Sequence, residues 1–343
     1  MSRVFEEIGY QVHRVIGNRP ERMLAIEHVK REVLQGHTYD FVYAESTSGP
    51  SLLVNRELYH PFRDFGFLRW CRLHSIPVGL YYRDVHWRFG IIRPDAPWYK
   101  EIHPLILFWY DWFCYYLALD HLFIQSMGMA KYLPTKWPAT RASSLPPGCD
   151  LAPLDDSDCK RPADDNLRLL YIGGVRPPIY DLKPMFEFVT KHPMLHLTVC
   201  CRDFEWAKIQ SYYEPFDRNK IRIIHAFGDQ LPALYESTHV FLLLLNPHTY
   251  WDFVMPVKLF EAIGFGKPLI TTAGTQVARF VEEEGLGWTV SSSDEFGNLI
   301  LYLQANPDLV LEKCRHVERV REQHTWQVRA QTVADVLGSY RKK

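Results

Sequence analysis

The chain has 343 residues, of which 47% are hydrophobic and 23% charged, and its formal net charge is −1. Its composition is that of a globular protein long enough for two ordinary domains. The balanced charge argues against a dedicated nucleic-acid-binding protein. Seven scattered cysteines without a Cys-x-x-Cys pair favour a reducing cytoplasm over a disulfide or metal framework.

The first part of the chain predicts helices alternating with strands, which is typical of a parallel, doubly wound sheet. We expect helices at 2–8, 21–35, 51–73, 99–119 and 128–133, and strands at 11–16, 39–44, 76–82 and 121–125. The aromatic run at 104–119 contains Asp111 and is shorter than a membrane span of about 20 residues. It fits either a helix buried beneath the sheet or a helix whose aromatic edge touches a membrane surface.

A segment rich in Pro, Asp and Ser at 134–167 predicts a linker, and a second alternating set follows it. We expect strands at 167–172, 195–201, 221–225, 240–245 and 268–272, and helices at 181–191, 232–237 and 326–340. The apolar run at 240–245 is typical of a central parallel strand.

The segment Asp252–Thr272 predicts a polar loop, a short helix and a buried strand. Pro256 suits the first helical turn, and Val257 and Phe260 are expected on the apolar face of the helix. Lys258 and Glu261 share the opposite face, because they are three residues apart. A helix start with a lysine in its first turn suits a phosphate, and Glu261 one turn later suits a sugar hydroxyl. The same spacing also occurs in solvated pairs on ordinary surface helices.

Residues 255–262, followed by Gly266-Lys-Pro268 and Gly274-Thr275, resemble the donor-binding segment of GT-B glycosyltransferases. The nearest types belong to the large bacterial families, family 4 or family 1, that build surface polysaccharides. The resemblance implies two Rossmann-like domains facing a cleft, with the nucleotide sugar held by the second.

The resemblance implies an acceptor-side domain at 1–148, a donor domain at 149–325, and a helix at 326–343 that packs back on the first domain. Such proteins normally begin with a strand and a glycine-bearing loop. This chain begins at what resembles the following helix, so we expect the first strand to be missing or trimmed.

The donor pocket implied by the resemblance draws on loops that follow strands of the second domain. The pocket includes the glycine turn of Gly173 and Gly174 and the cations Arg176 and Arg202. Phe227 and Gly228 stand where the backbone of such enzymes recognises the nucleobase. The helix start contributes Met255, Pro256, Val257, Lys258 and Glu261. Lone glycine turns and exposed arginines are common, so each of these also has an ordinary structural explanation. We expect no metal and no cofactor, because Lys258 can stabilise the leaving diphosphate.

Asp84 and His86 follow the strand at 76–82 and are the candidate catalytic residues, because ligands bind beyond the carboxyl ends of such strands. Asp84 can take the acceptor proton in an inverting attack, with His86 orienting it or acting itself. Alternatively, Asp84 pairs with Arg83 or caps the next segment. Glu45 is the reserve candidate. Retaining members of the family carry two glutamates eight positions apart, and Phe253 stands at the first of these positions.

We therefore expect a hexosyltransferase that uses a nucleotide diphosphate sugar, with UDP as the nucleotide, and a glycan or lipid-linked glycan acceptor. Its expected role is in surface polysaccharide synthesis, in the cytoplasm or peripherally at the inner membrane face. Two alternatives remain open. One is a nucleotide-sugar epimerase of the same fold, and the other is a carbohydrate-binding protein without turnover.

Overall fold

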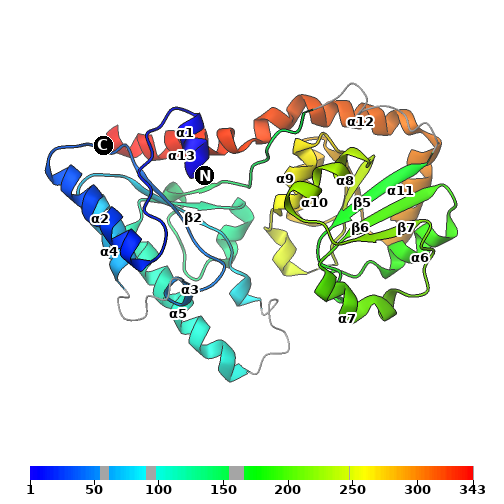
Figure 1. Ribbon diagram of the computed structural model, residues 1–343, viewed down its shortest axis with the longest axis horizontal. Coiled ribbons are helices and arrows are strands. Elements are labelled where there is room, and N and C mark those ends of the chain that lie inside the picture. The colour runs from blue at the N-terminus through cyan, green and yellow to red at the C-terminus, as the bar shows by residue number, and fades with distance from the viewer. Residues whose placement is uncertain (55–61, 90–97, 154–165, 247, 343) are drawn as a thin grey trace. The chain divides into compact units, whose positions relative to one another are not determined.

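The computed structural model describes residues 1–54, 62–89, 98–153, 166–246 and 248–342. It divides into two compact units, each built around its own sheet (Figure 1). Unit 1 comprises Met1–Pro146 together with Trp326–Lys343, and unit 2 comprises Pro147–Thr325. Both sheets are open and parallel, which confirms the predicted α/β class with two doubly wound sheets.

Unit 1 contains a four-stranded parallel sheet in the order β1-β2-β3-β4. Its strands are β1 (Val42–Glu45), β2 (Val78–Tyr82), β3 (His121–Ile124) and β4 (Ala142–Ser144). Its helices are α1 (Ser2–Glu7), α2 (Arg19–Leu34), α3 (Ser51–Val54), α4 (Arg63–Leu73), α5 (Trp98–Ala118) and α13 (Trp326–Gly338). Short 3-10 turns are η1 (His86–Arg88), η2 (Met127–Tyr132), η3 (Ala139–Arg141) and η7 (Ser339–Lys342).

The two faces of the unit 1 sheet are covered by different helices, because side chains alternate along a strand. Tyr81 packs with Phe5 of α1 and Leu337 of α13 in one apolar cluster. Its neighbour Tyr82 instead contacts Trp112 and Tyr115 of α5, with ring centroids 5.6 and 5.9 Å away. Helix α13 therefore contributes core to unit 1 although it follows unit 2 in the sequence.

Two predictions in unit 1 need correction. The strand predicted at 11–16 is wrong, because these residues join none of the four strands and only Val12 packs against the core formed with α1 and α13. The helix predicted at 51–73 is present as α3 and α4, and 55–61 between them lie outside the described residues. Helix α2 begins near its predicted start, where Asn18 and Glu21 form a capping box.

Unit 2 contains six parallel strands in the order β10-β9-β8-β5-β6-β7. These are β5 (Leu167–Ile172), β6 (Leu195–Cys200), β7 (Ile221–Ile224), β8 (Val240–Leu243), β9 (Leu269–Thr272) and β10 (Gly287–Val290). Its helices are α6 (Lys183–Lys191), α7 (Asp203–Tyr213), α8 (Pro232–Glu236), α9 (Val257–Gly264), α10 (Gln276–Glu283), α11 (Ser293–Ala305) and α12 (Pro307–Val320). Its 3-10 turns are η4 (Gly228–Gln230), η5 (Thr249–Asp252) and η6 (Arg321–His324).

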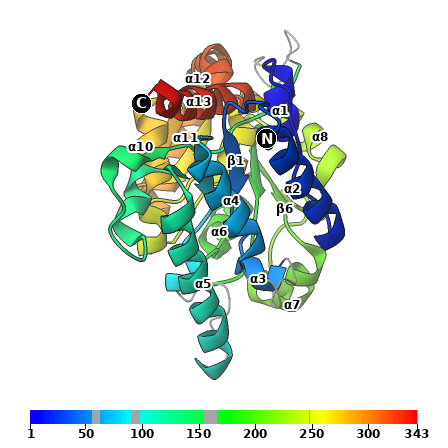
Figure 2. The same ribbon diagram turned by 90° about the vertical axis from the view of Figure 1, so that its left-hand side faces the viewer.

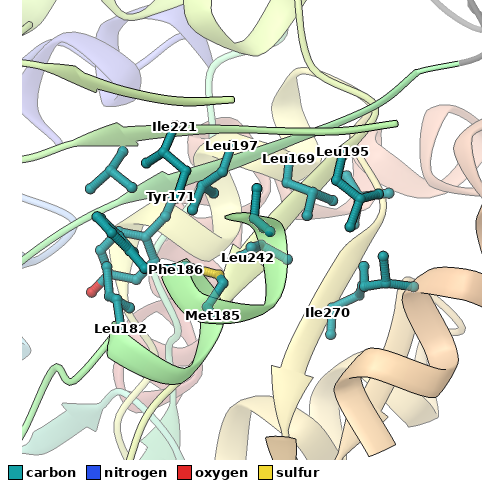
Figure 3. Close-up of a cluster of buried hydrophobic side chains, with 14 of the residues drawn as sticks. Leu169, Tyr171, Leu182, Met185, Phe186, Leu195, Leu197, Ile221, Leu242 and Ile270 are labelled. Atoms are coloured by element: carbon teal, nitrogen blue, oxygen red, sulfur yellow. The ribbon is translucent and has the colours of Figure 1, made fainter. Parts of the chain in front are cut away.

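Two apolar clusters cover opposite faces of the unit 2 sheet. Figure 3 shows the first, where Tyr171 of β5 and Leu197 of β6 lie with Met185 and Phe186 of α6. The second cluster contains Leu170 of β5 together with α9 residues such as Phe260. Neighbouring residues of β5 therefore enter different clusters, as expected for a strand buried on both faces.

Several elements of unit 2 were not predicted. Helices α7, α10, α11 and α12 and strand β10 lie where no element was expected, and β4 of unit 1 falls within the predicted linker. The part of that linker at 154–165 lies outside the described residues.

Helix α5 combines a buried and an exposed face. Trp112 and Tyr115 are buried, whereas Ile106, Trp109 and Phe113 are 60%, 44% and 61% exposed. Both views show the start of this helix extending away from the unit 1 sheet (Figures 1 and 2). Among the described residues, no helix is both long and apolar enough to cross a bilayer.

Candidate functional site

The order of strands in unit 2 creates a switch point between β5 and β8. From this point β6 and β7 extend the sheet in one direction, and β9 and β10 extend it in the other. All six strands are parallel, so the loops after them leave from the same edge. Open α/β sheets bind ligands beyond the carboxyl ends of the strands at such a point.

Helix α9 follows β8, and its N-terminus is the predicted phosphate-binding site. Pro256 is its extended N-cap residue, with φ −67° and ψ 143°. The Leu259 N–H already donates to the Pro256 carbonyl at 3.1 Å. The N–H groups of Val257 and Lys258 precede it at the helix start, where backbone donors can bind an anion. Val257 is 47% exposed, which corrects its expected place on the apolar face. Met255 is instead buried in the core, so its side chain packs against α9 and the sheet.

Lys258 and Glu261 form an anchored pair on α9. Lys258 Nζ donates to Glu261 Oε2 at 2.6 Å, and the buried Tyr235 of α8 donates its hydroxyl to the same oxygen at 3.1 Å. Burial, followed by the nearby Glu261 charge, raises the pKa of Tyr235, which keeps it a donor. The two α9 side chains are 31% and 29% exposed. The pair is therefore partly buried and held in position, which distinguishes it from a freely solvated pair.

Lys258 also lies near the end of β6. Burial raises the pKa of the Cys200 thiol, and a hydrogen bond to Ala226 and the charge of Lys258 partly oppose this rise. Cys200 is the last residue of β6, and Ala226 lies just after β7. Lys258 is therefore close to the edge of the sheet where the loops after β6 and β7 begin.

The predicted glycine turn after β5 is explained by close packing. A Cβ atom at Gly174 would lie 2.8 Å from the Tyr180 ring, and one at Gly173 would lie 2.9 Å from the Tyr171 hydroxyl. Tyr171 also donates to the Gly174 carbonyl at 2.6 Å. These glycines keep the turn close to the sheet edge, and Arg176 follows them as an exposed residue.

The other residues predicted to bind the nucleotide sugar lie in the loops after β6 and β7. Arg202 pairs with Glu205 at 2.8 Å and is 73% exposed, as expected for a surface ion pair. Phe227 is 77% exposed, and Gly228 after it has φ +55°. An exposed phenyl ring at the ligand edge of a sheet offers a flat apolar surface to a planar group.

The loop after β8 is tied to the end of β9 and to the loop after β5. Leu245 N–H donates to Thr272 Oγ1 at 2.8 Å, and Asn246 donates to the Pro178 carbonyl across the switch point. Trp251 is buried, and its indole N–H has no hydrogen-bond partner among the described residues. Phe253 is fully buried, so the position eight residues before Glu261 is occupied by a core residue.

In unit 1, Asp84 and His86 follow β2 as predicted and form a close pair. Asp84 Oδ1 accepts a hydrogen bond from the backbone N–H of His86 at 3.0 Å, and Asp84 Oδ2 lies 3.6 Å from the imidazole Nδ1 of His86. Asp84 thus accepts from the backbone of the turn that follows it, and Arg83 Nη2 lies 3.6 Å from Glu45 Oε2. His86 is buried and meets the Phe108 ring edge-on at 5.9 Å.

Sequence reasoning missed Tyr235, which fixes Glu261 but precedes it by 26 positions. The sequence placed Tyr235 in a predicted helix, but a separation of 26 positions gave no indication of contact with Glu261. The structure brings Lys258, Glu261 and Tyr235 together and keeps the loops containing Gly173 and Phe227 at the same sheet edge.

Comparisons with known proteins agree with this architecture. Residues 176–335 match a family model described as glycosyl transferase-like. The chain is similar in structure to HepE of Anabaena in complex with UDP, with a TM-score of 0.57 and 14% identity over 92% of this chain and 82% of HepE. A search of curated protein sequences gave no match.

Two further solved structures share the fold. Sucrose-phosphate synthase from Thermosynechococcus elongatus has a TM-score of 0.60 and 14% identity over 92% of this chain and 76% of its own. WaaG, a glycosyltransferase involved in lipopolysaccharide biosynthesis, has a TM-score of 0.51 and 13% identity over 95% of this chain and 98% of its own. The chain has the GT-B fold, and residues 176–335 are glycosyltransferase-like in sequence, which confirms the resemblance carried by residues 252–275.

Proposed function

We propose that the protein is a metal-independent glycosyltransferase that moves a hexosyl group from a UDP-linked sugar to a glycan acceptor. The observation that carries the proposal is the Lys258–Glu261–Tyr235 arrangement at the start of α9, beside the switch point of the unit 2 sheet. The structural similarity to HepE, which has been solved with UDP-glucose, supports UDP as the nucleotide.

In this proposal the diphosphate binds at the start of α9. The backbone N–H groups of Val257 and Lys258, together with Lys258 Nζ, bind its oxygens, and the helix dipole adds to their positive potential. Glu261 accepts hydrogen bonds from the ribose hydroxyls through Oε1, because Oε2 accepts from Lys258 and Tyr235. The exposed ring of Phe227 lies at the same edge and suits a nucleobase. These donors stabilise the leaving diphosphate without a metal ion or other cofactor.

The transfer step is a direct displacement with inversion. His86 accepts the proton of an acceptor hydroxyl, whose oxygen then bonds to the anomeric carbon. The bond from that carbon to the diphosphate breaks, and UDP leaves with the electron pair. Asp84 is a positioning residue, since its carboxylate accepts the His86 backbone N–H and lies 3.6 Å from His86 Nδ1. The buried Phe253, which replaces a carboxylate of retaining relatives, supports inversion.

We further propose a lipid-linked glycan acceptor at the inner face of a membrane, for surface polysaccharide synthesis. The exposed face of α5 supports this, because Ile106, Trp109 and Phe113 follow one another at helical spacing. Trp side chains favour the interface between water and lipid, and Phe side chains are typical of the apolar face of helices that lie in it. The replacement Ile106→Ser with Phe113→Ser should reduce sedimentation with anionic lipid vesicles, and unchanged sedimentation would remove the membrane from the proposal.

The function is tested with the purified full chain and a panel of UDP-sugars, by measuring UDP release with and without acceptor glycans. We expect one UDP-sugar to give acceptor-dependent UDP release, with His86→Gln losing most of the rate and Asp84→Asn losing less. The replacement His74→Gln, on an exposed histidine of the same unit, should leave the rate unchanged. Epimerisation of the donor without acceptor would indicate an epimerase, and binding without UDP release would indicate a binding protein. Either result would overturn the proposal.

A further inference from the structure

A cluster of imidazole and carboxylate groups lies in unit 1, outside the candidate sites described above. His13 comes from the extended segment before α2, His28 and Glu32 come from α2, and Tyr39 follows that helix. The helix is drawn in blue in Figure 1. His28 and Glu32 are four residues apart, so they lie on one face of α2, and the fold brings His13 against that face.

The distances within this cluster match those between ligands of one metal ion. His13 Nδ1 lies 3.3 Å from Glu32 Oε2, and His28 Nε2 lies 3.5 Å from Glu32 Oε1. One ligand atom from each of the three residues falls within 4.8 Å of the others. Two ligands of a tetrahedral zinc ion lie about 3.3 Å apart, because each bond is about 2.0–2.1 Å long.

A second group orients the carboxylate. The Tyr39 hydroxyl donates a hydrogen bond to Glu32 Oε2 and lies 2.9 Å from His13 Nδ1. This bond fixes the orientation of the Glu32 carboxylate and leaves Glu32 Oε1 facing His28 Nε2 at 3.5 Å. A ligating carboxylate that accepts such an outer hydrogen bond is the usual arrangement around protein metal ions.

We propose that His13, His28 and Glu32 bind a divalent transition-metal ion, with zinc as the best match. Imidazole and carboxylate ligands in a tetrahedral set suit zinc. A water molecule takes the fourth position, or His37 does after a side-chain rotation, since its ring lies 6.3 Å from that of His13. The side chains of His13 and Glu32 are 23% and 25% exposed and that of His28 is 59% exposed, so an ion can enter from solvent.

The ion would fasten the extended segment 10–16 to α2. That segment joins none of the strands of the described sheet, so few backbone hydrogen bonds fix it. The metal is structural in this role and takes no part in the proposed transfer reaction.

Zinc binding is tested on the purified full chain, stripped with a chelator, by competition with a chromophoric zinc indicator near pH 7.5. We expect one equivalent of zinc per chain and a higher melting temperature, with both effects reversed by the chelator. Removing a partner that only orients a ligand weakens metal binding by about 10–100-fold. We therefore expect losses of at least about 10-fold in His28→Gln and in Glu32→Gln.

The matched control is His74→Gln, which removes an exposed histidine at the end of α4, stacked on Trp70 at 3.9 Å. This variant should bind zinc like the unmodified chain. Circular dichroism without zinc shows whether each variant is folded. Absence of a one-to-one complex, full affinity in either His28→Gln or Glu32→Gln, or an equal loss in the control would overturn the proposal. Such results would leave a surface network of hydrogen bonds and ion pairs among Tyr39, Glu32 and the two histidines.

Discussion

The replacement Lys258→Ala should weaken the binding of UDP and UDP-glucose with little effect on the unliganded fold. The lysine bonds to Glu261 at 2.6 Å, and both side chains are about one-third exposed. A partly exposed ion pair of this kind contributes within about 1 kcal/mol to stability. A hydrogen bond from a charged group to phosphate contributes about 1.5–3 kcal/mol, which corresponds to roughly a 10- to 100-fold change in Kd.

These values define a measurable difference in thermal unfolding. A ligand at 100 times its Kd stabilises the folded state by about 2.7 kcal/mol. At the same ligand concentration, a 10- to 100-fold weaker variant retains about 1.4 to 0.4 kcal/mol. Isothermal titration calorimetry with UDP gives the two Kd values directly, and thermal shift measurements without ligand show whether the variant is folded.

Lys220→Ala is the matched control, because Lys220 also has an acidic partner three residues away. Its Nζ lies 3.6 Å from Asp217 Oδ2, and its side chain is 19% exposed. It directly precedes β7, so it lies at the amino end of the sheet, opposite the candidate site. The control should bind UDP normally. Equal affinity of the unmodified chain and Lys258→Ala would refute the phosphate role of Lys258, and equal loss in both variants would show a non-specific charge effect.

Three further results are expected. Tyr235→Phe keeps the buried ring but removes the bond to Glu261, so it should lower the unfolding free energy by about 1–2 kcal/mol in urea titrations and weaken UDP-glucose binding; unchanged binding would contradict the positioning role. Gly287→Ala should lower the unfolding free energy by about 1–3 kcal/mol, because a Cβ there would lie 1.9 Å from the Leu269 carbonyl oxygen. An unchanged urea midpoint would contradict this, because it would mean that β10 shifts away from β9 at no cost. Burial, helped by the Arg141 charge, lowers the pKa of His121 to about 4. The unfolded chain therefore binds the His121 proton at a higher pH than the folded chain does, and the unfolding free energy falls by about 3 kcal/mol as the pH drops from 6.5 to 4. The variant His121→Asn should lack this loss, and an equal loss in both proteins would contradict the assignment.

The sequence was sufficient for features that depend on short-range patterns. The apolar run of β8 predicted a central strand, and Lys258 and Glu261 could be paired because three positions separate them on one helix. The loops after the strands could be placed at one edge, because parallel strands share that edge.

Features that depend on long-range packing could not be predicted in this way. Tyr235 reaches Glu261 only because α8 and α9 flank β8 in the folded unit. The segment 11–16 has the alternating pattern of a strand, yet it pairs with no other strand of the described sheet, and its Val12 packs against the core beside α1. The bond from the His86 backbone N–H to Asp84 depends on the local turn after β2, which residue order alone does not specify.

Helix α13 has a consequence for how the protein folds as it is synthesised. Ala330, Val333 and Leu337 of this helix are buried with Phe5 and Phe123 in unit 1. The ribosome completes all of unit 2 before it makes these residues, so the second unit can become stable while the first still lacks part of its core. Domains usually fold in the order of their synthesis, but here the N-terminal unit is expected to finish last and to need chaperone protection longest.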